Sequence, residues 1–224
     1  MNKKKVLLSV LALILVCALS VAGTLAVLSK TTGALKNTFI ASATPENFVT
    51  EFNLKEYGVE ADNKGGYTKN NDVITAVAGA EKGNSYKMVP GLEIPKEVFV
   101  ELKRNNETPA YLFVEVVAKD MTDYTYSVDA TKWVALNGVT GAKGGAVYVY
   151  GADSAATPIG KVETAQNYTI LTGNKVTANA ELTKEEGTLT FYAYISQATV
   201  SVGGANTNDA AAVFNACFKQ PANP

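Results

Sequence analysis

The sequence lacks histidine entirely and has only two cysteines among its 224 residues. Without imidazole, the chain has no Ser/His or Cys/His nucleophile pair and no zinc motif that uses histidine ligands. Its charge is also modest and nearly balanced, with 20 Lys+Arg against 21 Asp+Glu. Composition therefore disfavours most classes of enzyme, and no motif assigns a cofactor or a metal ion, so none is expected.

Basic charge is concentrated at the amino terminus, where Lys3, Lys4 and Lys5 are the only charged residues of the first 26. Without this segment the chain keeps 17 of its 20 basic residues and all 21 acidic ones, a formal net charge of −4. Nucleic-acid binding depends on clustered Lys and Arg that displace counterions from phosphates. A mildly acidic body therefore argues against nucleic acid as a partner.

Residues 1–26 have the layout of a secretory signal peptide, with a basic start and an apolar, helical middle. Thr24 and Ala26 are the small residues that a signal peptidase accepts, so cleavage is expected before Val27, with the bond after Ala22 as second choice. The alternative is a permanent anchor, because the uncharged run from Val6 to Leu28 is long enough to cross a bilayer core of about 30 Å. Contact with a membrane is expected only through this segment when it stays uncleaved.

Removal of the signal peptide also removes Cys17 and leaves Cys217 as the single thiol. One cysteine excludes an intramolecular disulfide, so the mature chain must depend on strand pairing and core packing. A lone thiol among apolar residues usually acts as a small buried hydrophobe, and an intermolecular disulfide is the alternative.

Apolar residues of the mature chain recur with a period of two, which is typical of strands with one buried face. The clearest such runs are residues 97–104, 111–117, 145–150 and 188–196. Clusters of Gly and Asn separate them, so the pattern indicates an all-β sandwich or barrel and not alternating β-α-β units. We expect one domain over residues 44–220, with a polar insertion around 58–88 and a tail at 221–224.

Two segments have helical patterns. Residues 209–218 carry apolar side chains on one face, and Thr207 or Asn208 is expected to cap the start of this short C-terminal helix. Residues 44–57 form a second candidate, because Pro45 suits the first turn of a helix.

A series of short motifs runs through the chain in a fixed order. They are Ala22–Ala26 at the processing site, Lys36–Phe39, Val89–Gly91, Thr108–Tyr111, Trp133, Tyr148–Tyr150 and Gln197-Ala198. In this order the motifs resemble the TasA/camelysin family, secreted proteins of spore-forming and related Gram-positive bacteria whose signal peptides are cleaved by an endoplasmic-reticulum-type signal peptidase.

The resemblance implies a jelly-roll-like antiparallel β-sandwich in a secreted protein of the extracellular matrix or cell surface. Its partners would be itself or a related matrix subunit, besides the signal peptidase during export. Fibre-forming members insert the segment after the cleavage site into a neighbouring subunit's sheet. By this comparison residues 27–43 contain a possible donor strand, namely Asn37, Thr38, Phe39, Ile40 and Ala41. The alternative is that these residues form the first strand of their own domain.

Three further features of the sequence could carry chemistry. Some relatives are described as metallo-endopeptidases, so a surface-associated endopeptidase with a metal site that uses no histidine is the alternative function; because the chain has no histidine, zinc motif or nucleophile motif, we predict that it is not an enzyme. Asp120, Asp123 and Asp129 lack the spacing of a calcium-binding loop and are expected to be solvated loop carboxylates. Residues 141–145 lack the Gly-Lys-Ser/Thr of a phosphate loop and are predicted to be a hairpin turn.

Alternating tyrosines are the third feature. Tyr148, Tyr150, Tyr192 and Tyr194 are predicted either to form an exposed aromatic surface for a carbohydrate or protein, or to stabilise the solvent face by cross-strand pairing. An exposed surface would suit a monomeric adhesin or envelope binding module.

Overall fold

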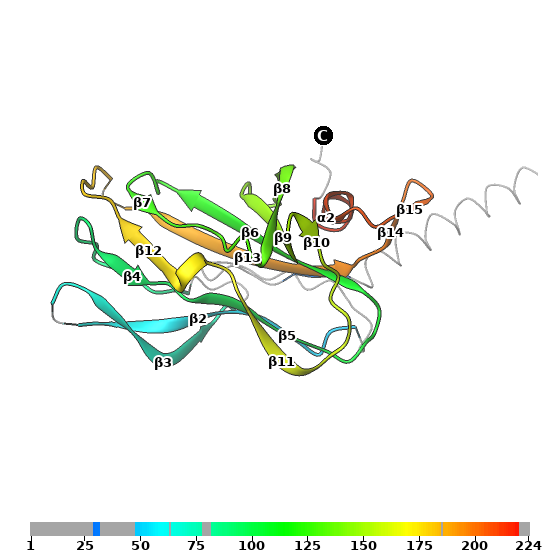
Figure 1. Cartoon of the computed structure of the whole chain (residues 1–224), viewed down its shortest axis with the longest axis horizontal. Coiled ribbons are helices and arrows are strands. Elements are labelled where there is room, and N and C mark those ends of the chain that lie inside the picture. The colour runs from blue at the N-terminus through cyan, green and yellow to red at the C-terminus, as the bar shows by residue number, and fades with distance from the viewer. Residues whose placement is uncertain (1–28, 32–47, 63, 78–81, 185, 220–224) are drawn as a thin grey trace, which may run out of the picture.

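The computed structural model describes residues 29–31, 48–62, 64–77, 82–184 and 186–219. This part of the chain is mostly β, with antiparallel sheets and one short C-terminal α-helix, as the sequence predicted (Figure 1). The elements are β1 (Ser29–Thr31), β2 (Glu51–Ala61), β3 (Tyr67–Thr75), β4 (Glu93–Pro95), β5 (Val98–Arg104), β6 (Ala110–Lys119), β7 (Tyr124–Thr125), β8 (Trp133–Thr140), β9 (Ala146–Ala152), β10 (Ala155–Ala156), β11 (Val162–Thr169), η1 (Thr172–Asn174), β12 (Lys175–Ala178), β13 (Thr188–Gln197), β14 (Val200–Val202), β15 (Ala205–Thr207) and α2 (Ala210–Phe218).

A six-stranded sheet has the order β1-β13-β6-β9-β10, with β8 also paired to β9. Strands β6 and β13 pair along their whole length, from Thr188 opposite Lys119 to Gln197 opposite Ala110. The turn between β8 and β9 closes with a hydrogen bond from Gly141 N–H to Gly145 C=O, so the hairpin predicted at residues 141–145 is confirmed.

A four-stranded sheet, with the order β11-β5-β2-β3, faces the first one (Figure 1). Strand β2 contradicts the helix predicted over residues 44–57, of which 44–47 lie outside the described residues. Its residues alternate between half-buried and buried from Glu51 to Glu56, and pairing with β5 on one side and β3 on the other satisfies its backbone. Part of the segment predicted to be a polar insertion, Tyr67–Thr75, is the edge strand β3.

The main core lies between these two sheets. Alternating residues of β2, β5, β6 and β13 meet there, which confirms the inward faces expected from the period of two. Its fully buried members from these strands include Leu54, Val98, Val100, Leu102, Leu112, Val114, Phe191, Ala193 and Ile195. A small sheet of β4, β12 and β7 lies at one end, where it flanks the pocket described below (Figure 1).

Helix α2 covers the opposite face of the six-stranded sheet (Figure 1). Phe214 and Phe218 pack there against Phe113 and Tyr194, with ring centroids 5.0 to 6.0 Å apart. The cap of the helix is Asp209, whose carboxylate accepts a hydrogen bond from Ala212 N–H at 2.8 Å, and not the predicted Thr207 or Asn208.

Cys217 is free and half-buried at this helix. Burial raises the pKa of its thiol to about 11, which suits the expected role as a small hydrophobe. Among the described residues, no helix is long and apolar enough to cross a membrane.

Candidate functional site

The exposed aromatic surface, one of the two alternatives predicted for the four tyrosines, does not form. Tyr192 and Tyr194 are buried, on the face that helix α2 covers. Tyr148 and Tyr150 lie on the other face of the sheet, half-buried against the main core. The prediction of an exposed stripe was wrong because both faces of this sheet are covered, which removes the support that these residues gave to a carbohydrate-binding reading.

The predicted processing and donor residues lie outside the described part of the chain. This holds for Thr24, Ala26 and Val27 and for Asn37, Thr38, Phe39, Ile40 and Ala41. The described piece of this region is β1, which pairs antiparallel with β13 and places Ser29 opposite Ser196 and Thr31 opposite Tyr194. A segment that directly follows the predicted cleavage site therefore adds a strand to the six-stranded sheet.

Other sheet edges carry features that oppose strand addition. Strand β3 places the charged Lys69 and Asp72 on its edge, and its pairing with β2 is shifted between Tyr57 and Val59. The pairing of β11 with β5 is shifted between Val162 and Gln166, and β10 has only two residues. Charges, bulges and short strands are the usual protection against edge-to-edge pairing. The edge of β13 is different, because the amino-terminal segment occupies it.

A buried carboxylate holds this sheet together near its centre. Glu115 of β6 is fully buried and accepts hydrogen bonds from Lys143 N–H and Gly145 N–H, both at 2.8 Å, and from the Tyr194 hydroxyl at 2.6 Å. A side chain at Gly141 would collide with the same carboxylate, which explains a glycine at that position. Since its described partners are neutral donors of the protein itself, Glu115 has a structural role.

The described carboxylates do not assemble a metal site from Asp120, Asp123 and Asp129. Asp123 accepts hydrogen bonds from the backbone N–H groups of Thr183 and Lys184, which lower the pKa of its carboxyl. Asp129 pairs with Lys132 at 3.1 Å. In the described ranges, no three or more His, Cys, Asp or Glu side chains lie close enough together to hold a metal ion.

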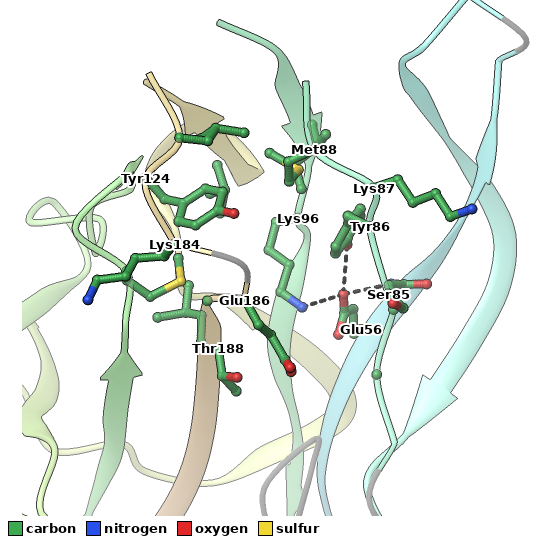
Figure 2. Close-up of a pocket in the computed structure, with 18 of the residues that line it drawn as sticks. Glu56, Ser85, Tyr86, Lys87, Met88, Lys96, Tyr124, Lys184, Glu186 and Thr188 are labelled. Carbon is green, nitrogen blue, oxygen red and sulfur yellow. Dashed lines mark hydrogen bonds and ion pairs between the residues drawn. The ribbon is translucent and has the colours of Figure 1, made fainter. Parts of the chain in front are cut away.

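An open pocket of about 690 Å³ lies beside the β4-β12-β7 sheet (Figure 2). Its walls include Tyr86, Met88 and Tyr124, and its charged residues are Lys82, Lys87, Lys96, Lys184, Glu56 and Glu186. Glu56 comes from β2 of the four-stranded sheet, Thr188 and Leu189 come from β13 of the six-stranded sheet, and Lys96 comes from the link between β4 and β5, so the pocket lies between parts of the two main sheets. At one edge of the pocket, the Asp123 carboxylate accepts hydrogen bonds from the backbone N–H groups of Thr183 and Lys184 and so fixes their position.

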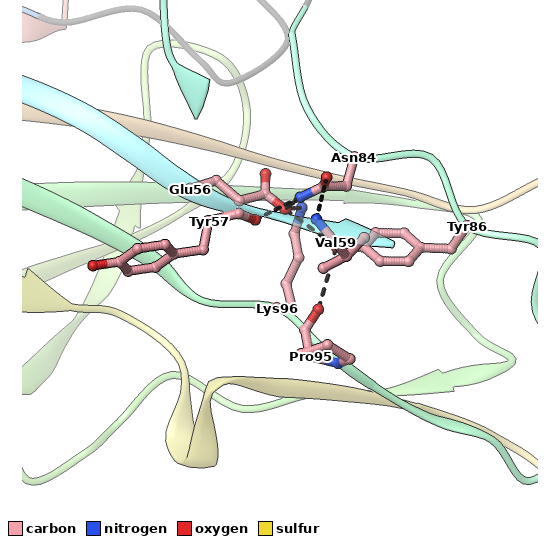
Figure 3. Close-up of polar contacts among 7 residues, drawn as sticks. All are labelled: Glu56, Tyr57, Val59, Asn84, Tyr86, Pro95 and Lys96. Atoms are coloured by element: carbon pink, nitrogen blue, oxygen red, sulfur yellow. Dashed lines mark hydrogen bonds and ion pairs between the residues drawn. The ribbon is translucent and has the colours of Figure 1, made fainter. Parts of the chain in front are cut away.

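Glu56 is the least expected residue of this pocket, because a carboxylate stands where the alternation of β2 places a core side chain. It is fully buried, and its Oε1 atom accepts hydrogen bonds from Lys96 Nζ at 2.7 Å, Asn84 Nδ2 at 2.6 Å and the Tyr86 hydroxyl at 3.2 Å (Figure 3). Burial, followed by the charge of Glu56, raises the pKa of Tyr86, which keeps this hydroxyl protonated as a donor. The Oε2 atom has no partner among the described residues.

Sequence reasoning missed this cluster of Glu56, Asn84 and Lys96. The available signal was the in-phase series Phe52, Leu54, Glu56, where an acidic residue follows two core positions at a spacing of two. The prediction of a helix over residues 44–57 hid this series, because a spacing of two has no meaning for the face of a helix. Nothing local pointed to Asn84 or Lys96, which come from a loop and a link 28 and 40 residues further along the chain.

Comparison with models of protein families, with curated proteins and with solved structures finds no match for this chain.

Proposed function

We propose that the chain is a secreted structural subunit of the extracellular matrix or cell surface, with a jelly-roll-like β-sandwich fold, that associates by strand addition. The motif order noted in the sequence and the all-β architecture with two facing sheets support this proposal. The observation that carries it is the pairing of β1 with β13, because the segment beyond the predicted cleavage site pairs with a sheet edge.

The physical basis is the exchange of one strand for an identical one. The N–H and C=O groups of an edge strand accept an extended segment, and alternate side chains of that segment fill positions on the sheet. A segment that pairs with β13 of its own subunit makes equivalent bonds to β13 of a neighbour. Exchange of the strand between subunits would then change the free energy of each strand pair little, because the same bonds form within one subunit and between two. Repeated exchange would still link subunits into a chain.

Single-cysteine subunits test the exchange. In a Cys217→Ala background, one subunit carries Ser29→Cys and another carries Ser196→Cys, since these residues face each other across the β1–β13 pair. Directly opposed residues of an antiparallel pair are about 4.5–5.5 Å apart, within reach of a disulfide. Mixing processed forms of both subunits under mild oxidation should give a covalent heterodimer, whereas Thr188→Cys, eight residues away on β13, should not trap Ser29→Cys.

Three results would overturn the proposal. The first is a mixture of these subunits that stays monomeric and uncross-linked while the double variant closes its own disulfide, which would make β1 a private strand. The second is a processed protein, starting at Val27 by amino-terminal sequencing, that forms no filaments or oligomers by negative-stain microscopy across salt and pH. A form lacking residues 27–43 serves as the control, and filaments from it would refute strand addition specifically.

A further inference from the structure

The cluster of Glu56, Asn84 and Lys96 brings the buried amine of Lys96 and the half-buried amide of Asn84 to one buried carboxylate, that of Glu56 (Figure 3). Lys96 Nζ and Asn84 Nδ2 both donate to the same atom, Glu56 Oε1, at 2.7 and 2.6 Å. The two nitrogens therefore lie within two hydrogen-bond lengths of each other. An amine close to a carboxamide, with a carboxylate touching both, has the parts required for acyl transfer.

Hydrogen bonds fix the orientation of the Asn84 amide. Its Nδ2 also donates to Tyr57 C=O at 2.8 Å, so both amide hydrogens have acceptors. Its Oδ1 accepts a hydrogen bond from Val59 N–H at 3.2 Å. A backbone N–H on this oxygen polarises the Asn84 carbonyl and stabilises the negative charge that develops there when a nucleophile adds to Cγ.

The surroundings of Lys96 limit its contact with water. Lys96 is 8 % exposed and Glu56, its hydrogen-bond partner, is fully buried. Proton transfer from Nζ to Glu56 converts the amine to its nucleophilic form, and Glu56 Oε1 lies 2.7 Å from Nζ, where it can accept that proton. The unpartnered Oε2 atom gives the acid form a second position for the proton.

We propose that Lys96 and Asn84 form an intramolecular amide bond and that Glu56 transfers the protons. Glu56 takes one proton from the Lys96 ammonium, the neutral Nζ adds to Cγ of Asn84, and the Val59 N–H stabilises the resulting oxyanion. Glu56 then passes a proton to Nδ2, the Cγ–Nδ2 bond breaks and ammonia leaves through the adjacent pocket. One C–N bond forms and one breaks, so the reaction needs no oxidant or other reactant.

The consequence is a covalent staple in a chain whose predicted mature form has one cysteine. The bond would join the loop that contains Asn84 to the link between β4 and β5, next to β2. It would also make Lys96 resistant to trypsin, because the side chain would no longer be a cation.

The same protein contains a comparator with the same three residue types. Glu101 Oε2 accepts hydrogen bonds from Lys55 Nζ at 2.6 Å and from Asn53 Nδ2 at 3.2 Å. The side chains of Lys55 and Glu101 are 20 % and 21 % exposed, and among the described residues no group donates a hydrogen bond to the Asn53 side-chain carbonyl oxygen. Water solvates the Lys55 ammonium there, so this set is expected to stay unreacted.

Mass spectrometry of the folded, processed protein tests the proposal. The expected mass is lower than that of the sequence by one ammonia, about 17 Da. Trypsin should cut after Lys82, Lys87 and Lys103 but not after Lys96, and should release residues 83–87 joined to residues 88–103 through Asn84 and Lys96. Cleavage after Lys55 should proceed normally.

The digest separates the bond from other losses of ammonia. A cyclic imide at Asn84 has the same mass but leaves Lys96 free for trypsin, so that pattern would overturn the proposal, as would the full sequence mass. Lys96→Arg and Asn84→Ala should have their full masses, and Asn84→Asp should lose water, about 18 Da, because hydroxide replaces ammonia as the leaving group. A −17 Da form of Glu56→Gln with the same joined peptide would retain the bond but refute the role of Glu56.

Discussion

Replacement of Glu115 provides the sharpest test of how the six-stranded sheet is held together. In Glu115→Ala, the buried Gly145 N–H and Tyr194 hydroxyl lose their acceptor, whereas Lys143 N–H is only partly buried and can turn to water. Each buried donor left without a partner costs about 1–3 kcal/mol, and the two together with the cavity give an expected loss of about 3–5 kcal/mol in the free energy of unfolding.

The graded variant Glu115→Gln separates hydrogen bonding from shape. Glutamine keeps the size of the side chain and one acceptor oxygen, which can still take both backbone N–H groups, so the expected loss is only about 1–2 kcal/mol. Glu101→Ala is the matched control, because that carboxylate is partly exposed and its ion pair with Lys55 should contribute less than about 1 kcal/mol.

Urea denaturation at neutral pH, followed by tryptophan fluorescence and circular dichroism, measures these differences if the denaturant slope is unchanged. A Glu115→Ala protein within about 1 kcal/mol of the original in free energy of unfolding, or equal losses for Glu115→Gln and Glu115→Ala, would contradict a stabilising role for the hydrogen bonds of Glu115.

Three further predictions concern the helix and the pocket rim. Phe214→Ala should lower the free energy of unfolding by about 3–5 kcal/mol, because the ring is fully buried against the sheet; a loss below 1 kcal/mol in the same urea assay would contradict that packing. Asp209→Ala should cost about 1 kcal/mol through the lost cap, and Asp209→Asn should restore most of it. The pKa of Asp123 is lowered in the folded protein by the N–H groups of Thr183 and Lys184, so its contribution to stability is present above the unfolded pKa of 3.8 and is lost as the pH falls through the lower folded value. The difference in thermal midpoint between the original and Asp123→Asn should therefore narrow below about pH 4, and a constant difference from pH 7 to 2 would contradict it.

Much of the strand architecture could be predicted because a period of two records which residues share a face. The inward series Val98, Val100, Leu102 and its counterparts in β6 and β13 were identified from this period alone. The C-terminal helix could be predicted in the same way from its apolar stripe, although its cap shifted to Asp209 because that carboxylate reaches Ala212 N–H.

The failures share a physical cause. Alternation predicts which residues share a face, but not whether the other face is covered. It therefore allowed an exposed surface at Tyr192 and Tyr194, which a helix some twenty residues later buries. Proline is compatible with the first turn of a helix and also with the start of a strand, so Pro45 did not distinguish the two over residues 44–57. Residues Glu51–Ala61 form a strand because β2 pairs with β5 on one side and with β3 on the other.

The candidate site was beyond sequence reasoning for the same reason. Glu56, Asn84 and Lys96 are ordinary polar residues in their local contexts, and each would be expected at a surface. Only the register of β2 on β5, together with the path of the loop through Asn84, brings the three to one buried oxygen atom.

The sequence by itself determined that the first 28 residues are basic and then apolar, that the rest is mildly acidic with a period of two in its apolar residues, and that no histidine is present, because composition and periodicity can be read without knowing the fold. The tertiary structure decided which faces are covered, that β1 pairs with β13, and that an amine, an amide and a carboxylate meet beside the pocket. Such contacts depend on strand register and burial between residues far apart in the chain, and no local pattern encodes them.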